Sequence, residues 1–231
     1  MQSPSKSRIE VPAIKSFVSY CKVRTVPARR LLIHAGDQSD SLFYLVKGSV
    51  EVMIEDEDGK EIVLAYLNAG HFFGEMGFFY QELNRTAWVR TRTRCEVAEM
   101  TYTRFERLID ENQELVVELA VQLANRLTRT NQKLGDLAFL DVAGRVAHEL
   151  ANLAREPDAT AVENGMAVKV TRSQLGRLVG CTREMVGRVL KILVEQGLIV
   201  DDGRTIIVLD QASLLTERTP KSIDQAAEKV G

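Results

Sequence analysis

The longest regular pattern of apolar positions in the chain runs from about residue 114 to residue 139. Steps of four and three residues alternate along it and mark Val116, Ala120, Leu123, Leu127, Thr130, Leu134 and Leu137. This spacing predicts a helix with a coiled-coil seam that a second copy of the chain would cover. The alternative is an amphipathic helix packed within its own domain, because three heptads are few.

Short strands are predicted before this helix. Across residues 23–100, runs of valine, isoleucine, leucine and aromatic residues are separated by turn signals. The acidic turn at residues 56–60 predicts a hairpin between the runs at 50–55 and 61–67. Regularly spaced short strands favour a sandwich or barrel. A short helix is expected over residues 12–20.

A helix-turn-helix is predicted after the long helix, over residues 171–190. Thr171 and Thr182 are suited to cap its two helices, and Gly180 can adopt the positive φ of the turn between them. Gly176 is small where the helices must cross closely. Several linked positions therefore agree on one motif, which makes the signal specific.

The segments around this motif complete a small domain. Residues 142–155 are helical in pattern, and residues 159–166 are expected to form a loop. Residues 198–200 and 205–208 predict a β hairpin, so we expect a winged helix-turn-helix.

Charge is distributed unevenly along the chain. The net charge of the 231 residues is −2, but residues 169–191 carry six basic residues and one acid, Glu184. A local positive patch of this kind suits nucleic acid even where the whole protein is slightly acidic.

The sequence gives no sign of a metal site, a disulfide framework or a membrane span. The three cysteines are far apart and form no cluster with histidines: Cys21, Cys95 and Cys181. No apolar run is long enough to cross a bilayer, and residues 1–11 lack the apolar stretch of a signal peptide. We therefore expect a cytoplasmic protein without a resident metal.

A second motif combines glycines, a carboxylate and an arginine. Gly74, Glu75, Met76 and Gly77 follow an apolar run, and Arg85 and Thr86 come shortly after them. Free backbone amides and a guanidinium suit a phosphate, whereas a carboxylate suits ribose hydroxyls. Taken alone, the motif is better explained by a tight turn with a surface Glu–Arg ion pair than by a ligand site.

These residues resemble the phosphate-binding cassette of a cyclic-nucleotide-binding domain. The resemblance rests on Gly48 and Gly70, the Gly-Glu-Met-Gly turn and the Arg-Thr-Ala that follows it. It implies a β roll in which Arg85 and the turn backbone hold a cyclic phosphate, Thr86 adds a phosphate contact, and Glu75 takes the ribose 2′-hydroxyl.

Nearly the whole chain resembles the cyclic AMP receptor protein family of the Crp/Fnr superfamily. In that family a Thr-Ser pair on the long helix reads the adenine, with one residue supplied by the partner subunit. Here the pair is Thr130 and Asn131. Asparagine can still donate and accept hydrogen bonds, but the substitution leaves cyclic AMP, cyclic di-GMP, another effector or no effector as alternatives.

The family resemblance and the chemistry of the side chains assign the DNA contacts. Arginine suits the guanine edge and glutamate accepts from cytosine, so Arg183, Glu184 and Arg188 are expected to read bases. Other basic residues lie nearer the phosphates. The candidate DNA-binding set is Thr171, Arg172, Ser173, Thr182, Arg183, Glu184, Arg188 and Lys191.

The sequence thus predicts an α+β protein with four segments: a β-roll domain (12–112), a dimerisation helix (113–139), a winged helix-turn-helix (140–210) and a C-terminal tail (211–231). We expect a homodimeric transcription regulator, controlled by cyclic AMP, that binds double-stranded DNA. RNA polymerase is a further candidate partner, through the loop at 158–166. An enzyme regulated by a nucleotide would need a catalytic constellation, and the scattered histidines form none. A haem or redox sensor is a further alternative, which a visible absorption spectrum would test.

Overall fold

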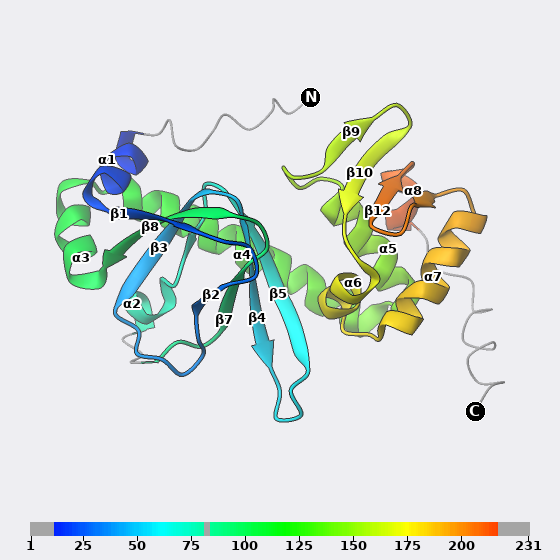
Figure 1. The fold of residues 1–231 in the computed structure, drawn as a ribbon, viewed down its shortest axis with the longest axis horizontal. Coiled ribbons are helices and arrows are strands. Elements are labelled where there is room, and N and C mark those ends of the chain that lie inside the picture. Colours follow the sequence, from blue (N-terminus) through cyan, green and yellow to red (C-terminus); the bar gives the residue numbers. More distant parts are fainter. Residues whose placement is uncertain (1–11, 81–83, 217–231) are drawn as a thin grey trace. The chain divides into compact units, whose positions relative to one another are not determined.

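The computed structural model describes residues 12–80 and 84–216. The chain divides into two compact units between Arg129 and Thr130, and each unit is described here by itself (Figure 1). The long helix α4 (Glu114–Phe139) contributes to both units. Its bounds are those that the apolar pattern predicts.

The first unit is a roll of two four-stranded antiparallel sheets. The strand orders are β1-β8-β3-β6 and β2-β7-β4-β5. The strands are β1 (Lys22–Val26), β2 (Leu31–Ile33), β3 (Ser41–Lys47), β4 (Ser49–Glu55), β5 (Glu61–Asn68), β6 (Phe72–Phe73), β7 (Trp88–Thr91) and β8 (Cys95–Thr101). The predicted hairpin is β4–β5, which pairs Glu55 with Glu61 across its turn. The prediction of a β roll is confirmed.

Four helices accompany the sheets, namely α1 (Pro12–Tyr20), α2 (Met76–Tyr80), α3 (Tyr102–Glu111) and the start of α4. Two apolar cores hold the unit together. One core includes Leu45, Val50 and Val97, from β3, β4 and β8. The other packs α1, α3 and α4 against the roll, with Phe17 at its centre in edge-on contact with Phe72 and other rings. The second of these cores fixes the position of α4 against the roll.

Helix α4 buries one face and exposes another. Leu115 and Leu119 are almost fully buried in the core of the first unit. Gln122 is buried beside them, where its side-chain amide accepts from the Phe72 N–H at 2.9 Å and donates to the Gly70 carbonyl at 3.0 Å. The buried face of α4 thus binds the roll partly through a satisfied polar group, as burial of an amide requires.

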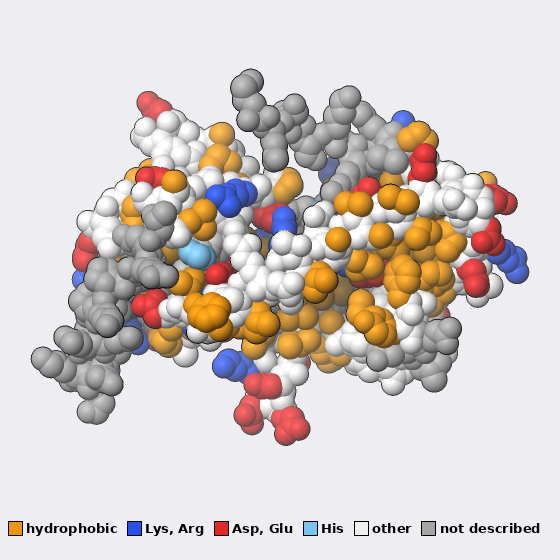
Figure 2. Space-filling model, turned by 180° about the vertical axis from the view of Figure 1, so that it is seen from behind, with side chains coloured by type: hydrophobic (Ala, Val, Ile, Leu, Met, Phe, Trp, Pro, Cys, Tyr) orange, Lys and Arg blue, Asp and Glu red, His pale blue; other side chains and the backbone are white. Residues whose placement is uncertain are grey.

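The predicted seam residues lie mostly on the exposed face of α4. Leu127, Leu134 and Leu137 are 60 %, 65 % and 57 % exposed. Val116 and Ala120 are also exposed, whereas Leu123 packs partly against the core of its own unit. Exposed hydrophobic side chains also gather on the face drawn in Figure 2. An apolar stripe of this kind usually marks an interaction surface.

The second unit is a winged helix-turn-helix with one four-stranded sheet. Its helices are α5 (Val142–Leu153), α6 (Arg172–Val179), α7 (Arg183–Glu195) and α8 (Gln211–Thr216), and its strands are β9 (Thr160–Val162), β10 (Gly165–Lys169), β11 (Ile199–Asp201) and β12 (Thr205–Val208). The sheet order is β11-β12-β10-β9. The predicted wing hairpin is β11–β12.

The prediction of a loop at 159–166 is wrong, because β9 and the start of β10 form a hairpin there. The two turn residues are Glu163 and Asn164, because Val162 pairs directly with Gly165. The predicted tail also begins with helix α8, in which Leu214 is fully buried. Asp210 caps α8 by accepting from the N–H groups of Ala212 and Ser213. Residues 217–231 lie outside the described residues.

The helix-turn-helix has the local structure that its sequence predicts. Thr171 and Gln174 form a reciprocal capping box at the start of α6, and the Thr182 side chain caps α7. Gly180 has φ 70° in the turn. A Cβ on Gly176 would lie 2.6 Å from the Cys181 carbonyl oxygen, so the turn passes too close to α6 for any larger residue.

Candidate functional site

A cavity in the first unit is lined by both parts of the glycine–arginine motif. Its lining includes residues 74–77, residues 84–87 and Arg126, together with apolar side chains of the roll. Residues 74 and 75 connect β6 to α2, and residues 84–87 precede β7. The fold therefore brings together residues that the sequence separates.

Arg85 is the most constrained side chain of the cavity. Its side chain is 8 % exposed, and its two terminal nitrogens donate to the backbone carbonyls of Gly74 at 2.9 Å and Ser41 at 2.8 Å. Gly74 has φ 75°, and a Cβ there would lie 3.0 Å from Arg85 Nη1. A glycine is therefore required both by the backbone and by the close approach of the guanidinium.

The Tyr102 hydroxyl connects Arg85, the glycine turn and Ser39. Its hydroxyl donates to the Gly74 carbonyl at 2.6 Å, accepts from Arg85 Nη1 at 3.1 Å, and lies 2.8 Å from Ser39 Oγ. A Cβ on Gly77 would lie 2.9 Å from the same hydroxyl and would also clash with Ser39. The absence of a side chain at Gly77 therefore lets the start of α2 pack against Ser39 and Tyr102.

Glu75 is buried and ion-paired, but not with Arg85. Its side chain is 4 % exposed and accepts from Arg126 Nη1 of helix α4 at 2.8 Å. Arg126 Nη2 also donates to the Phe72 carbonyl. A surface Glu75–Arg85 ion pair therefore does not explain the motif, and α4 reaches the cavity through Arg126, which sequence reasoning missed.

The remaining nucleotide-site candidates are exposed, apart from the half-buried Gly77. Met76 and Gly77 begin α2 and line the cavity, and the exposed Thr86 lines it beside Arg85. Thr130 and Asn131 are exposed residues of α4 that belong to the second unit, and the lining of the cavity does not include them. Their contact with a ligand stays a prediction.

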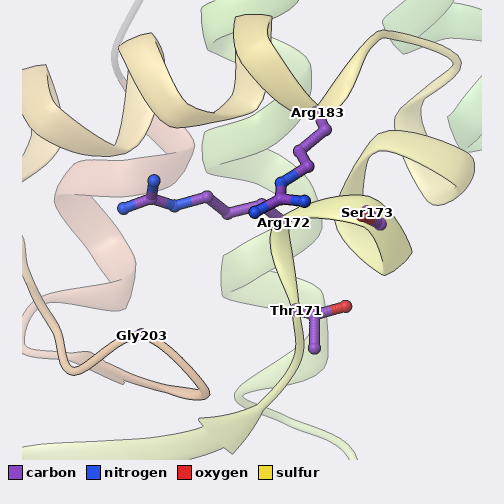
Figure 3. Close-up of a pocket in the computed structure, with 5 residues that line it drawn as sticks. All are labelled: Thr171, Arg172, Ser173, Arg183 and Gly203. Carbon is purple, nitrogen blue, oxygen red and sulfur yellow. The ribbon is translucent and has the colours of Figure 1, made fainter.

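A hollow in the second unit lies between the helix-turn-helix and the wing. It is lined by Thr171, Arg172, Ser173, Arg183 and Gly203 (Figure 3). The remaining candidates on α7 and at its start are exposed: Thr182, Glu184, Arg188 and Lys191. The surface that the sequence assigned to DNA is therefore accessible, and most of its charged groups are basic.

Two of these cations have protein partners. Lys191 Nζ lies 3.9 Å from Glu195 Oε1 on the next turn of α7. Arg172 Nη2 donates to Asp201 Oδ2 of β11 at 3.1 Å. Arg172 also lies beside the middle of α7, because a Cβ on Gly187 would be 3.6 Å from its Nη1. Sequence reasoning placed Arg172 near phosphates and did not foresee this ion pair.

Other chemistry finds little support in the described residues. Among them, no group of three histidine, cysteine or acidic side chains could hold a metal ion. None of their helices combines the length and the apolar character that a membrane crossing requires. Cys21, Cys95 and Cys181 are free, and burial raises the pKa of each thiol, that of Cys21 to about 12.

Comparison with known proteins agrees with both parts of this geometry. The sequence model of the cyclic nucleotide-binding domain matches residues 23–112, and that of the Crp-like helix-turn-helix domain matches residues 144–216. The cAMP-activated global transcriptional regulator CRP of Escherichia coli O6:H1 is 49 % identical over 197 residues, which are 85 % of this chain and 94 % of that protein. The chain belongs to the Crp/Fnr family of transcription regulators.

Further relatives support this classification but differ in effector. The cAMP-activated regulator Vfr of Pseudomonas aeruginosa is 48 % identical over 84 % of this chain and 92 % of its own length. The c-di-GMP-responsive regulator CLP of Xanthomonas campestris has a similar structure, with a TM-score of 0.80 and 38 % identity over 87 % of this chain and all of that one.

The predicted fold class and family are thereby confirmed. So is the prediction of a DNA-binding transcription regulator rather than an enzyme.

Proposed function

We propose that this regulator is a homodimer whose affinity for a palindromic DNA site is controlled by cyclic AMP bound in the cavity of the first unit. The observation that carries the proposal is the convergence of a buried arginine, Arg85, and a buried carboxylate, Glu75, on one cavity. A guanidinium suits the cyclic phosphate, and a carboxylate suits the ribose hydroxyl. The bound nucleotide would supply a negative charge and hydrogen-bond donors to these groups.

The ion pair between Glu75 and Arg126 supports a route from the cavity to α4. A hydroxyl that donates to Glu75 shares this carboxylate with Arg126, so ligand binding acts on the ion-pair partner of a residue of α4. The ligand can then favour one arrangement of the long helices over another, which is a population shift. Thr130 and Asn131 are the proposed base-reading pair.

Dimerisation is supported by the exposed apolar stripe of α4. Leu127, Leu134 and Leu137 recur at seam spacing and are more than half exposed. Pairing of two such stripes would hold the two copies of α7 at a fixed separation, about 34 Å for half-sites one DNA turn apart. Arg183, Glu184 and Arg188 would read bases, and Thr171, Arg172, Ser173, Thr182 and Lys191 would contact the backbone. Contact with RNA polymerase stays a prediction.

Cyclic di-GMP is the second candidate effector. Two observations favour it, namely the structural likeness to CLP and the asparagine at position 131 in place of the serine that the family resemblance implies. The proposed architecture and DNA contacts are the same for either nucleotide.

Isothermal titration with cyclic AMP, cyclic GMP and cyclic di-GMP tests the effector. We expect saturable binding of cyclic AMP that Arg85→Lys weakens and Arg85→Ala abolishes. Arg94→Ala is the matched control, because Arg94 is an exposed arginine of the same unit that does not line the cavity. Binding of cyclic di-GMP alone would replace cyclic AMP as the effector. Equal affinity of cyclic AMP for the wild type and Arg85→Ala would refute the assignment of the cavity.

A further inference from the structure

An acidic group pairs with a residue that lines the hollow between the helix-turn-helix and the wing, where a DNA-binding surface is expected to be basic. Arg172 and Arg183 both enter this hollow, and in Figure 3 Arg183 reaches from the start of α7 toward Arg172. Asp201 ends β11 beside them and places its carboxylate 3.1 Å from Arg172 Nη2. One of the two cations is therefore paired within the protein.

The Asp201 carboxylate is held in place from both sides. Its Oδ1 accepts from the Gly203 N–H at 2.9 Å, which fixes it to the turn of the wing, and its Oδ2 accepts from Arg172. The Asp201 side chain is 12 % exposed, whereas that of Arg172 is 46 % exposed. The carboxylate is thus the anchored partner, and Arg172 is the partner that can move.

The Arg172 side chain connects α6 to the wing. The residue begins α6, runs past Gly187 in the middle of α7 and ends at the wing. Asp201 takes one of the five N–H donors of the Arg172 guanidinium. The other donors stay available, but the carboxylate beside them offsets the positive charge that would attract a phosphate.

We propose that Asp201 is a specificity-determining residue, which lowers affinity for non-specific DNA by offsetting the positive charge of Arg172 that a phosphate would otherwise meet. Non-specific binding depends on phosphate neutralisation alone. Offsetting one cation per subunit therefore weakens that background mode directly, whereas base-edge contacts from α7 still act at a cognate site. The inference rests on the proposed contact of Arg172 with phosphates.

The sharpest test compares two neutralised carboxylates of the same wing turn. Asp201→Asn removes the charge that faces Arg172, and its side-chain oxygen can still accept from Gly203. Asp202→Asn is the matched control, because Asp202 is exposed on the same turn and the described residues include no side-chain partner for it. The full chain is titrated onto a mixed-sequence DNA duplex, by fluorescence anisotropy, from 50 to 200 mM salt.

We expect Asp201→Asn to steepen the dependence of log K on log salt by about 0.9 per subunit, the value of one added phosphate contact. Over that salt range this corresponds to about a three- to fourfold larger loss of affinity per contact. Asp202→Asn should leave the slope near that of the wild type. In an Arg172→Ala background, Asp201→Asn should no longer steepen it, since the cation that Asp201 offsets is gone.

Equal slopes for Asp201→Asn and Asp202→Asn would overturn the inference. So would weaker binding by Asp201→Asn than by the wild type, since that result would make Asp201 a residue that positions Arg172 for DNA. If the wild type itself shows no salt-dependent binding, the proposed DNA surface fails and the inference fails with it. If the wild type shows salt-dependent binding and Asp201→Asn does not change the slope, only the role of Asp201 is refuted and the proposed DNA surface stands.

Discussion

The ion pair between Glu75 and Arg126 gives the sharpest prediction about the first unit. Arg126→Ala leaves the Glu75 carboxylate, which is 4 % exposed, without its cationic partner. Breaking a buried pair costs about 3–5 kcal/mol. Because the Arg126 side chain is 22 % exposed and water can reach it, we expect a smaller loss of about 2–3 kcal/mol in the free energy of unfolding.

The double variant isolates the buried charge from the other contacts of Arg126. Glu75→Gln in the Arg126→Ala background replaces the unpaired carboxylate with a neutral amide and should recover about 1–2 kcal/mol. Recovery should be incomplete, because the Phe72 carbonyl still lacks the hydrogen bond from Arg126.

Urea unfolding followed by tryptophan fluorescence measures these changes in the first unit. Trp88 is the only tryptophan of the chain and lies in β7, so its signal reports on that unit. Arg107→Ala, at an exposed arginine of helix α3, controls for loss of an arginine from a helix. An Arg126→Ala loss no larger than that of Arg107→Ala, or no recovery in the double variant, would refute the reasoning.

Three further predictions follow from single contacts. Gly77→Ala would place a Cβ 2.9 Å from the Tyr102 hydroxyl, so titration calorimetry should show about tenfold weaker nucleotide binding. Unchanged affinity would contradict the role of the Tyr102 hydroxyl in positioning the glycine turn and Arg85. Leu134→Glu should shift the dimer to monomer in analytical ultracentrifugation, because a charge would be buried in the seam. Gln132→Glu, the control, should leave the dimer intact. A persistent Leu134→Glu dimer would refute the proposed seam. Burial raises the pKa of Cys21 to about 12, so its thiol stays protonated at pH 8. Its thiolate fraction there is about a thousandfold smaller than that of free cysteine, and higher nucleophilicity offsets only part of this. It should therefore react with iodoacetamide more than about tenfold more slowly than free cysteine and gain rate toward pH 12. Equal rates at pH 8 would contradict its burial.

Local signals in the sequence predicted the second unit well. Thr171, Thr182 and Gly180 act through their own backbone neighbours, so each can be assigned without knowledge of the fold. The hairpin at β9–β10 lacked such a signal, because its turn residues are Glu163 and Asn164 and the exposed strand before them has no apolar alternation. The cap at Asp210, by contrast, signals the start of α8.

Contacts between distant segments could not be predicted in the same way. Arg126 pairs with Glu75 across 51 positions of sequence, and Tyr102 joins Ser39 to Gly74 only because β3, β6 and β8 lie in one sheet. One indirect signal pointed to Arg126 as a residue of the ligand site, because it lies one helical turn before Thr130, which the sequence assigned to that site. The heptad pattern predicted the exposed stripe of α4, but the face of α4 that binds the roll includes a glutamine that no apolar pattern reveals.

The central claim is that a cyclic nucleotide in the Arg85–Glu75 cavity controls DNA binding. The most direct measurement is the affinity of the full chain for a palindromic duplex, obtained by selection from random sequences, with and without saturating cyclic AMP. We predict that cyclic AMP tightens binding by the wild type and by Arg94→Ala at least tenfold and leaves Arg85→Ala unchanged. Equal affinities with and without cyclic AMP in the wild type, or an undiminished response in Arg85→Ala, would contradict the account.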